Sequence, residues 1–83
     1  MSKVILVTGT SGGLGKSIAE QLTEDGHIVY GAARSQASSQ VSYHQVVMDV
    51  TSESDIRKAM ETIVREQGRI DVLVNNAGLA LGV

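Results

Sequence analysis

Short apolar runs alternate along the chain with stretches in which apolar residues recur at helical spacing. Residues 4–7 are apolar throughout, which is typical of a strand buried on both faces of a parallel sheet. By the same reasoning, residues 27–33, 45–50 and 70–74 are predicted to be strands. Residues 35–42 are small and polar, so we expect a loop between the second and third strands.

Two amphipathic helices are predicted between these strands. The first follows residues 9–15, and Gly26 stands where the glycine after a helix C-terminus is expected. The second begins at a cap formed by Thr51 or Ser52 and ends at Gly68. Ser52 and Asp55 have the spacing of a capping box. The apolar stripe of this helix consists of Ile56, Ala59, Met60, Ile63 and Val64.

The order strand, helix, strand, loop, strand, helix, strand predicts an α/β fold with a parallel sheet between helices. The link from Ala33 to Gln45 is barely long enough for a parallel crossover. Right-handed crossovers then give the strand order 3-2-1-4. We therefore expect residues 1–83 to form one Rossmann-type domain, the incomplete half of a doubly wound fold.

Composition excludes several classes of protein. The 83 residues are 42% hydrophobic and 19% charged with a net charge of −2, so we expect neither nucleic acid nor an anionic membrane as a partner. No cysteine is present, which excludes disulfides and a thiol nucleophile. The apolar runs are too short for a membrane span or a signal peptide, and we expect a cytoplasmic protein. His27 and His44 lack partners at metal-ligand spacing, so no metal site is predicted.

A glycine-rich turn, residues 8–15, joins the first strand to the first helix. Glycines let the backbone approach an anion, and the N–H groups and dipole of a helix N-terminus attract it, so this turn predicts a phosphate site. The dinucleotide pattern G-x-G-x-x-G is absent. A P-loop is suggested by Gly15-Lys16-Ser17 and by Asp49 after an apolar strand, but Gly9 and Gly15 enclose one residue more than a Walker A motif allows.

The turn does fit T-G-x-x-x-G-x-G, and in this the chain resembles the short-chain dehydrogenase/reductase family. Thr8, Gly9, Gly13 and Gly15 occupy the fixed positions, while Gly12 also satisfies T-G-x-x-G-x-x-G, the form of a longer, epimerase-like branch. Glycines alone therefore do not distinguish the two branches.

Two further motifs strengthen the resemblance. Asn75-Asn76-Ala77-Gly78 matches the N-N-A-G signature of the shorter, dehydrogenase-like branch, and Asp49-Val50 matches the acidic position after the third strand. Together the three motifs cover nearly the whole chain.

The resemblance implies that the ligand is a nicotinamide dinucleotide. The turn residues that would bind its pyrophosphate and adenosine ribose are Gly9, Thr10, Ser11, Gly13, Leu14 and Gly15. Asp49 and the Val50 backbone would contact the adenine, although Asp49 can also be explained as a turn acid before a helix. Asn76, Ala77 and Gly78 would line the adenosine ribose and approach the nicotinamide, while Asn75 would brace the sheet.

The end of the second strand discriminates between NAD and NADP. NAD-binding proteins place an acid there, about twenty residues after the glycine turn, whereas this chain has Ala33-Arg34. The Arg34 guanidinium suits a 2′-phosphate, and Ser35 could add a hydroxyl. NADP is therefore the predicted cofactor; the alternative is a solvated arginine in a loop.

No catalytic residue of the family is present. Its chemistry uses a serine and a Y-x-x-x-K pair, but Tyr30 is followed by Arg34 at that spacing and Tyr43 by Val47. We expect the NADP-binding part of an oxidoreductase that transfers hydride between the nicotinamide and a carbonyl or alcohol, inactive as this chain alone. The alternatives are a non-catalytic NADP-binding or regulatory module and a P-loop-like nucleotidase.

The fourth predicted strand would leave an apolar edge without a partner, and residues 79–83 are apolar as well. We therefore expect self-association through this edge, or pairing with a missing C-terminal half. Purified residues 1–83 should be aggregated or dimeric in size-exclusion chromatography. A monodisperse monomer that melts cooperatively would contradict this expectation and favour the stand-alone module.

Overall fold

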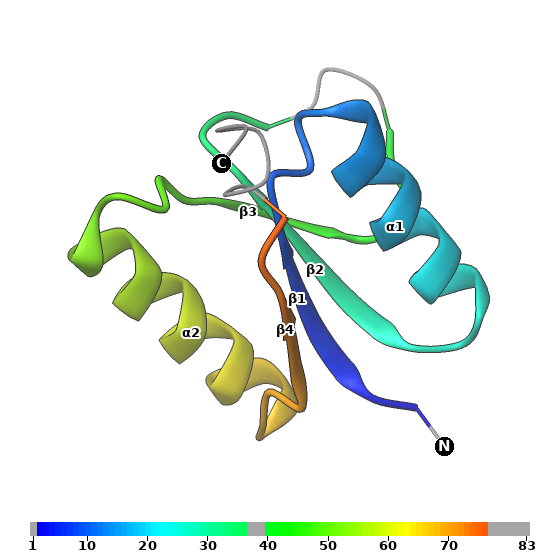
Figure 1. The fold of residues 1–83 in the computed structure, drawn as a ribbon. Helices are drawn as coiled ribbons and strands as arrows, with labels where there is room; N and C mark the ends of the chain where they lie inside the picture. The colour runs from blue at the N-terminus through cyan, green and yellow to red at the C-terminus, as the bar shows by residue number, and fades with distance from the viewer. Residues whose placement is uncertain (1, 37–39, 77–83) are drawn as a thin grey trace.

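The computed structural model describes residues 2–36 and 40–76. Within them, six elements follow one another: β1 (Val4–Thr8), α1 (Gly13–Glu24), β2 (Ile28–Ala33), β3 (His44–Val47), α2 (Glu53–Gln67) and β4 (Val72–Val74). The strands form one parallel sheet in the order β3-β2-β1-β4 (Figure 1). This confirms the predicted Rossmann-type arrangement.

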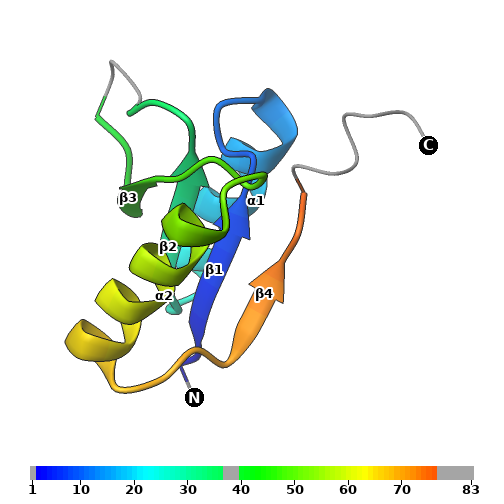
Figure 2. The ribbon, with the colours of Figure 1, turned by 90° about the vertical axis from the view of Figure 1, so that its left-hand side faces the viewer.

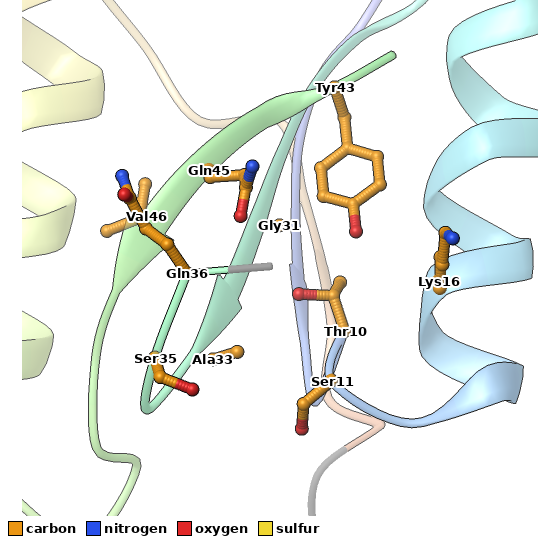
Figure 3. A pocket seen from close by; sticks show the side chains of 10 residues that line it. All are labelled: Thr10, Ser11, Lys16, Gly31, Ala33, Ser35, Gln36, Tyr43, Gln45 and Val46. Carbon is orange, nitrogen blue, oxygen red and sulfur yellow. The ribbon is translucent and has the colours of Figure 1, made fainter. Parts of the chain in front are cut away.

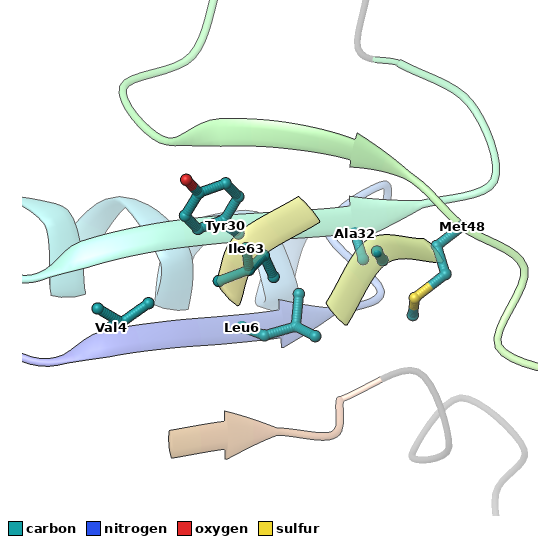
Figure 4. Close-up of a cluster of buried hydrophobic side chains, with 7 residues drawn as sticks. Val4, Leu6, Tyr30, Ala32, Met48 and Ile63 are labelled. Atoms are coloured by element: carbon teal, nitrogen blue, oxygen red, sulfur yellow. The ribbon is translucent and has the colours of Figure 1, made fainter. Parts of the chain in front are cut away.

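The sheet separates two apolar clusters, because successive residues of β1 point to opposite faces. One helix covers each face (Figures 1 and 2). On the α2 face the buried cluster consists of Val4, Leu6, Tyr30, Ala32, Met48, Ala59 and Ile63 (Figure 4). On the α1 face it consists of Ile5, Val7, Ala19, Val29 and Tyr43. The two central strands, β1 and β2, contribute to both clusters, which explains their apolar sequences.

The described part of the link between β2 and β3, residues 34–36 and 40–43, forms no helix. Instead, Tyr43 covers the α1 face beside β2, and its side chain is buried against Gly31. A Cβ atom on Gly31 would lie 2.4 Å from the Tyr43 ring. The absent side chain at Gly31 therefore makes room for the aromatic ring, and a short loop can close this side of the sheet.

Side chains that bind the backbone set the ends of several strands. The Val4 N–H donates to Asp71 Oδ2 at 2.8 Å, and the pairing of β4 with β1 runs from Val72, two residues later than the predicted start. Lys3 N donates to His27 Nδ1 at 3.0 Å, and β2 starts at Ile28 instead of residue 27.

β3 starts at His44, one residue before the predicted start, and stops at Val47, three residues before the predicted end. Met48 N still donates to the Ala33 carbonyl at 2.8 Å, but β2 itself ends at Ala33. Beyond that point β3 has no neighbouring strand to continue the pairing.

The ends of both helices follow the predicted caps. Ser52 Oγ accepts from the Asp55 N–H at 3.3 Å, while Gly26 and Gly68 adopt positive φ angles of 97° and 85°. The predicted capping box is only half formed, because Asp55 Oδ2 accepts from Asp49 N at 3.0 Å and the Ser52 N–H donates to the Asp49 carbonyl. Asp55 thereby ties the start of α2 to the end of β3.

Apolar surface remains on β4, the edge strand beside β1, where Val72 is 38% and Leu73 50% exposed. Neither α1 nor α2, the helices of the described residues, is long and apolar enough to cross a membrane.

A hydrogen-bonded tyrosine joins β2 to the last turn of α2. Tyr30 is only 2% exposed, and its hydroxyl donates to Glu66 Oε1 at 2.6 Å and accepts from Gln67 Nε2 at 3.0 Å. Its ring stacks on His44, with centroids 4.7 Å apart. Burial raises the pKa of Tyr30, and the bond to Glu66 raises it further.

We expect Tyr30→Phe to lower the free energy of unfolding by about 1–2 kcal/mol, since it removes a buried hydroxyl with two partners. The folded state holds the Tyr30 proton more tightly than the unfolded state. The stability that this proton contributes is therefore complete below the ordinary tyrosine pKa of 10.0 and is lost as the pH rises through the folded-state value. Urea unfolding at neutral and alkaline pH should show a smaller fall in the free energy of unfolding with rising pH for the variant than for the wild type.

The matched control is Tyr43→Phe. Tyr43 is also buried, but its hydroxyl has no hydrogen bond among the described residues. An equal loss of stability in both variants would show that the bonds to Glu66 and Gln67 contribute nothing.

Candidate functional site

The carboxyl ends of the four parallel strands meet at one edge of the sheet. The glycine turn follows β1, Arg34 follows β2, Asp49 follows β3, and Asn75-Asn76 follows β4. In open α/β sheets this edge is where ligands bind. The structure thus brings together the described parts of all three sequence motifs, while Ala77 and Gly78 lie outside the described residues.

Backbone hydrogen bonds fix the glycine turn against β2. The N–H groups of Gly9 and Thr10 both donate to the Ala32 carbonyl, at 2.9 and 3.2 Å, and Thr10 Oγ1 donates to the same oxygen at 3.3 Å. Gly9 has a φ of 75°, in the left-handed region that favours glycine. The turn leaves the end of β1 in a single defined direction.

The turn is also held from β4, on the other side of β1. Asn76 is 9% exposed, and its Nδ2 donates to the Gly9 carbonyl at 3.3 Å. Gly15 packs into the same place: a Cβ there would lie 2.2 Å from Gly9 O and 2.7 Å from Asn76 Nδ2. Gly15 is therefore required by the packing of the chain on itself.

Gly13 differs from Gly15, because no described atom outside its chain neighbours and its own helix backbone lies within 4 Å of the position that its Cβ would take, and its φ is not positive. Folding does not require glycine there, whereas the close approach of a ligand would. Gly12, the N-cap of α1, has no side-chain cap bond, and the first turn holds no acidic residue. The N–H groups of this first turn have no partners within the helix and can bind an anion. Leu14 is 61% exposed beside them.

Asn75 and Asn76 differ in their partners. Thr8 Oγ1 donates to Asn75 Oδ1 at 3.0 Å, which places Asn75 beside the end of β1. The amide nitrogen of Asn76 is engaged by the glycine turn, so Asn76 supports the site as well as bordering it.

Asp49 is half-buried and forms a turn before α2. Its Oδ1 accepts from Thr51 N at 2.9 Å and from Thr51 Oγ1 at 2.7 Å. These bonds hold the pKa of Asp49 below its usual value, and the charge of Arg34 adds a smaller effect in the same direction. The carboxylate is therefore ionised at neutral pH, and it has the geometry of a turn acid.

The remaining predicted residues are open to solvent. Arg34 and Ser35 are exposed, and Val50 is 39% exposed. Arg34 forms no ion pair or hydrogen bond with another described residue. Ser11 is also exposed, at the tip of the glycine turn. Residues 2–36 and 40–76 contain no cluster of three or more His, Cys, Asp or Glu side chains that could hold a metal ion.

Sequence reasoning missed two features of this region. One is the bond from Asn76 to Gly9, which joins residues 67 positions apart. The other is a pocket on the α1 face whose lining includes Lys16, Tyr43 and Gln45. Neither feature follows from a local sequence pattern. The sequence indicated only that the segments after β1 and β4 lie at the same edge of the sheet.

Comparisons with known proteins agree with this geometry. The short chain dehydrogenase family matches residues 3–83. The chain is 48% identical over 80 residues to a 3-ketodihydrosphingosine reductase of Bacteroides thetaiotaomicron, covering 96% of this chain and 30% of that protein. It is 38% identical over 86 residues to an NADPH-dependent pterin aldehyde reductase of Arabidopsis thaliana, covering 93% of this chain and 36% of that protein. The chain thus spans about a third of the length of these curated relatives.

Solved structures give the same result. A ligand-free aldohexose dehydrogenase of Thermoplasma acidophilum superposes with a TM-score of 0.84 at 35% identity, over 90% of this chain and 29% of that one. A 3-ketoacyl-(acyl-carrier-protein) reductase of Brucella melitensis, solved with NADH, superposes with a TM-score of 0.76 at 27% identity, over 86% of this chain and 32% of that one.

The two glycines should respond differently to alanine. Gly15→Ala forces a Cβ against backbone, and we expect it to lower the free energy of unfolding by about 3 kcal/mol. Gly13→Ala, the matched control, should leave stability unchanged or raise it by about 0.5–1 kcal/mol, since alanine favours the helix. Chemical denaturation of both variants measures the difference. Equal stability of the two would contradict the packing of Gly15 on Gly9 and Asn76.

Proposed function

The chain belongs to the short-chain dehydrogenase family, and on that premise we propose that it is the N-terminal, NADP-binding portion of an oxidoreductase of the dehydrogenase-like branch. The reaction that we propose for the whole protein is hydride transfer between a nicotinamide and a carbonyl or alcohol carbon. One observation carries the proposal: the glycine turn, braced by Asn76, leaves open backbone at Gly13 where an anion can approach.

The pyrophosphate of the cofactor would lie against the first turn of α1. The uncapped N–H groups there donate, and the helix dipole adds positive potential. Leu14, exposed beside them, would cover part of the ligand. Thr10 is already bonded to the Ala32 carbonyl, so we assign it to shaping the turn, and the exposed Ser11 to the contact with the ligand.

Arg34 would determine the preference for NADP over NAD. Residues 33–35 contain no carboxylate to bind the 2′-hydroxyl of NAD, and the Arg34 guanidinium has no partner among the described residues. A planar, permanently charged group of this kind suits a phosphate monoester. The NADPH-dependent relative from Arabidopsis supports NADP, whereas the Brucella structure holds NADH, so the choice depends on this chain's own residues.

The adenine would lie between Asp49 and Val50 and the glycine turn. Asp49 is ionised and offers an acceptor for the exocyclic amine beyond the bonds that Oδ1 makes to Thr51. Asn76, with Ala77 and Gly78 outside the described residues, would border the adenosine ribose.

Bound nicotinamide supplies or accepts the hydride; the residues of this chain bind and orient it. Neither tyrosine of the chain is suited to proton transfer at this site. Tyr30 is buried on the α2 face with its hydroxyl bonded to Glu66, and Tyr43 is buried on the α1 face. The proton would have to come from residues beyond this chain. Because the chain contains no Y-x-x-x-K pair, a non-catalytic NADP-binding module is the alternative.

The cofactor choice can be tested by replacing Ala33→Asp together with Arg34→Ala in the intact gene product that carries this chain. Removing the guanidinium and adding a carboxylate should weaken NADPH binding by about tenfold or more and strengthen NADH binding. Fluorescence titration with both cofactors measures the change. Arg57→Ala, an exposed arginine on α2, is the control and should change neither affinity.

Three outcomes would contradict the proposal. Equal titration of NADPH and NADH before and after the double change would contradict the cofactor choice. Stabilisation by ATP with magnesium, but not by NADPH, in a thermal-shift assay would favour the nucleotidase. Tight NADPH binding without any carbonyl-dependent NADPH oxidation by the intact gene product would favour the non-catalytic module.

A further inference from the structure

A pocket of about 270 Å³ lies on the α1 face of the sheet, beside the glycine turn (Figure 3). Thr10 and Ser11 of the turn lie near its centre, Lys16 of α1 lines it on one side, and Ser35, which follows β2, lies on the other. None of the described residues that line it is acidic, and Lys16 is the one cation among them. The charged part of the pocket wall is therefore positive.

The floor of this pocket is rigid. The Tyr43 ring packs against Gly31, where a Cβ would meet it at 2.4 Å and Thr10 Cγ2 at 2.9 Å. Tyr43 is 6% exposed, and Thr10 Oγ1 is tied to the Ala32 carbonyl at 3.3 Å. The side chains below the opening thus have little freedom, and a ligand group would enter between Ser11 and Ser35.

Arg34 adjoins this opening in sequence without lining it. Ala33 and Ser35 line the pocket whereas Arg34, between them, does not, and its charge contributes to the lowered pKa of Asp49. A phosphate monoester between Ser11 and Ser35 would lie beside the chain position of Arg34, which is the one basic residue among residues 33–36. Such a group carries nearly two negative charges at neutral pH, so a single arginine leaves it incompletely neutralised.

The glycine turn supplies no cation, since residues 8–15 contain no lysine or arginine. Lys16 is half-buried and forms no ion pair with any described residue, including Glu20 one helical turn later. A lysine that is partly withdrawn from water without a carboxylate beside it is available to an anion.

We propose that Lys16 is the second cation of the 2′-phosphate subsite besides Arg34, and that it reaches the phosphate through the pocket that it lines with Ser11 and Ser35. This inference rests on the proposed function, because it takes NADP as the cofactor. It assigns a specificity role to a side chain for which the sequence suggested only the lysine of a P-loop.

The test is Lys16→Gln in the intact gene product, titrated with 2′,5′-ADP and with 5′-ADP, which differ only in the 2′-phosphate. We expect affinity for 2′,5′-ADP and for NADPH to fall about tenfold, and affinity for 5′-ADP and NADH to change less than about twofold. Lys16→Arg should retain most of the affinity. Lys58→Gln, an exposed lysine on α2, is the matched control and should behave as wild type.

Salt gives a second readout. The difference in affinity between 2′,5′-ADP and 5′-ADP should depend more weakly on ionic strength in Lys16→Gln, because one charged contact is lost. Thermal melting of the variant without ligand, unchanged from wild type, shows that the fold is intact.

The possible failures are distinguishable. Wild-type protein that binds 5′-ADP and NADH as tightly as the 2′-phosphorylated ligands overturns the choice of NADP and this inference with it. A wild-type preference for NADPH that survives Lys16→Gln overturns this inference alone. An equal loss of affinity for all four ligands in Lys16→Gln also overturns it, because Lys16 would then act on a group that the four ligands share.

Discussion

The contact of the glycine turn with the end of β4 is the constraint on which the site depends. The Gly9 carbonyl accepts from Asn76 Nδ2 at 3.3 Å, and Gly15 approaches the same carbonyl so closely that no side chain fits between them. This contact sets where α1 starts relative to the sheet. The direction of its first N–H groups follows, and with it the position that an anion can occupy. A packing requirement of the fold thereby orients the candidate anion site.

The same edge of the sheet also brings oppositely charged residues near each other. Arg34 and Asp49 follow neighbouring parallel strands, so the topology places a cation and a carboxylate side by side without a direct ion pair between them. Thr51 satisfies Asp49 Oδ1, which keeps the carboxylate ionised and fixed. Arg34 remains exposed and without a partner among the described residues. Along this edge the carboxylate is held by hydrogen bonds, whereas the guanidinium is exposed to solvent.

Elements and topology could be predicted from the sequence, because strands that are buried on both faces of a parallel sheet have continuous apolar runs such as residues 4–7. The strand order and all six elements were correct. The boundaries of several strands were not, and two reasons lie outside local patterns: the Asp71 carboxylate binds Val4 N, and β3 outlasts its neighbour β2. For the site, sequence motifs placed the residues at one edge but could not show that Asn76 binds the turn, nor that Tyr43 and Gly31 form the floor of a pocket.

An ionised Asp49 and a doubly charged phosphate at one edge would repel each other, so the arrangement requires positive charge around them. Exposed like charges some distance apart in water interact by about 1 kcal/mol or less, but exclusion of water by a bound cofactor strengthens the repulsion. Arg34 forms no ion pair with Asp49, and its charge has only a small effect on the pKa of that carboxyl. With NADP as the proposed cofactor, a single arginine leaves the doubly charged phosphate incompletely neutralised. Lys16 lines the pocket beside the glycine turn and is the cation proposed to complete this charge.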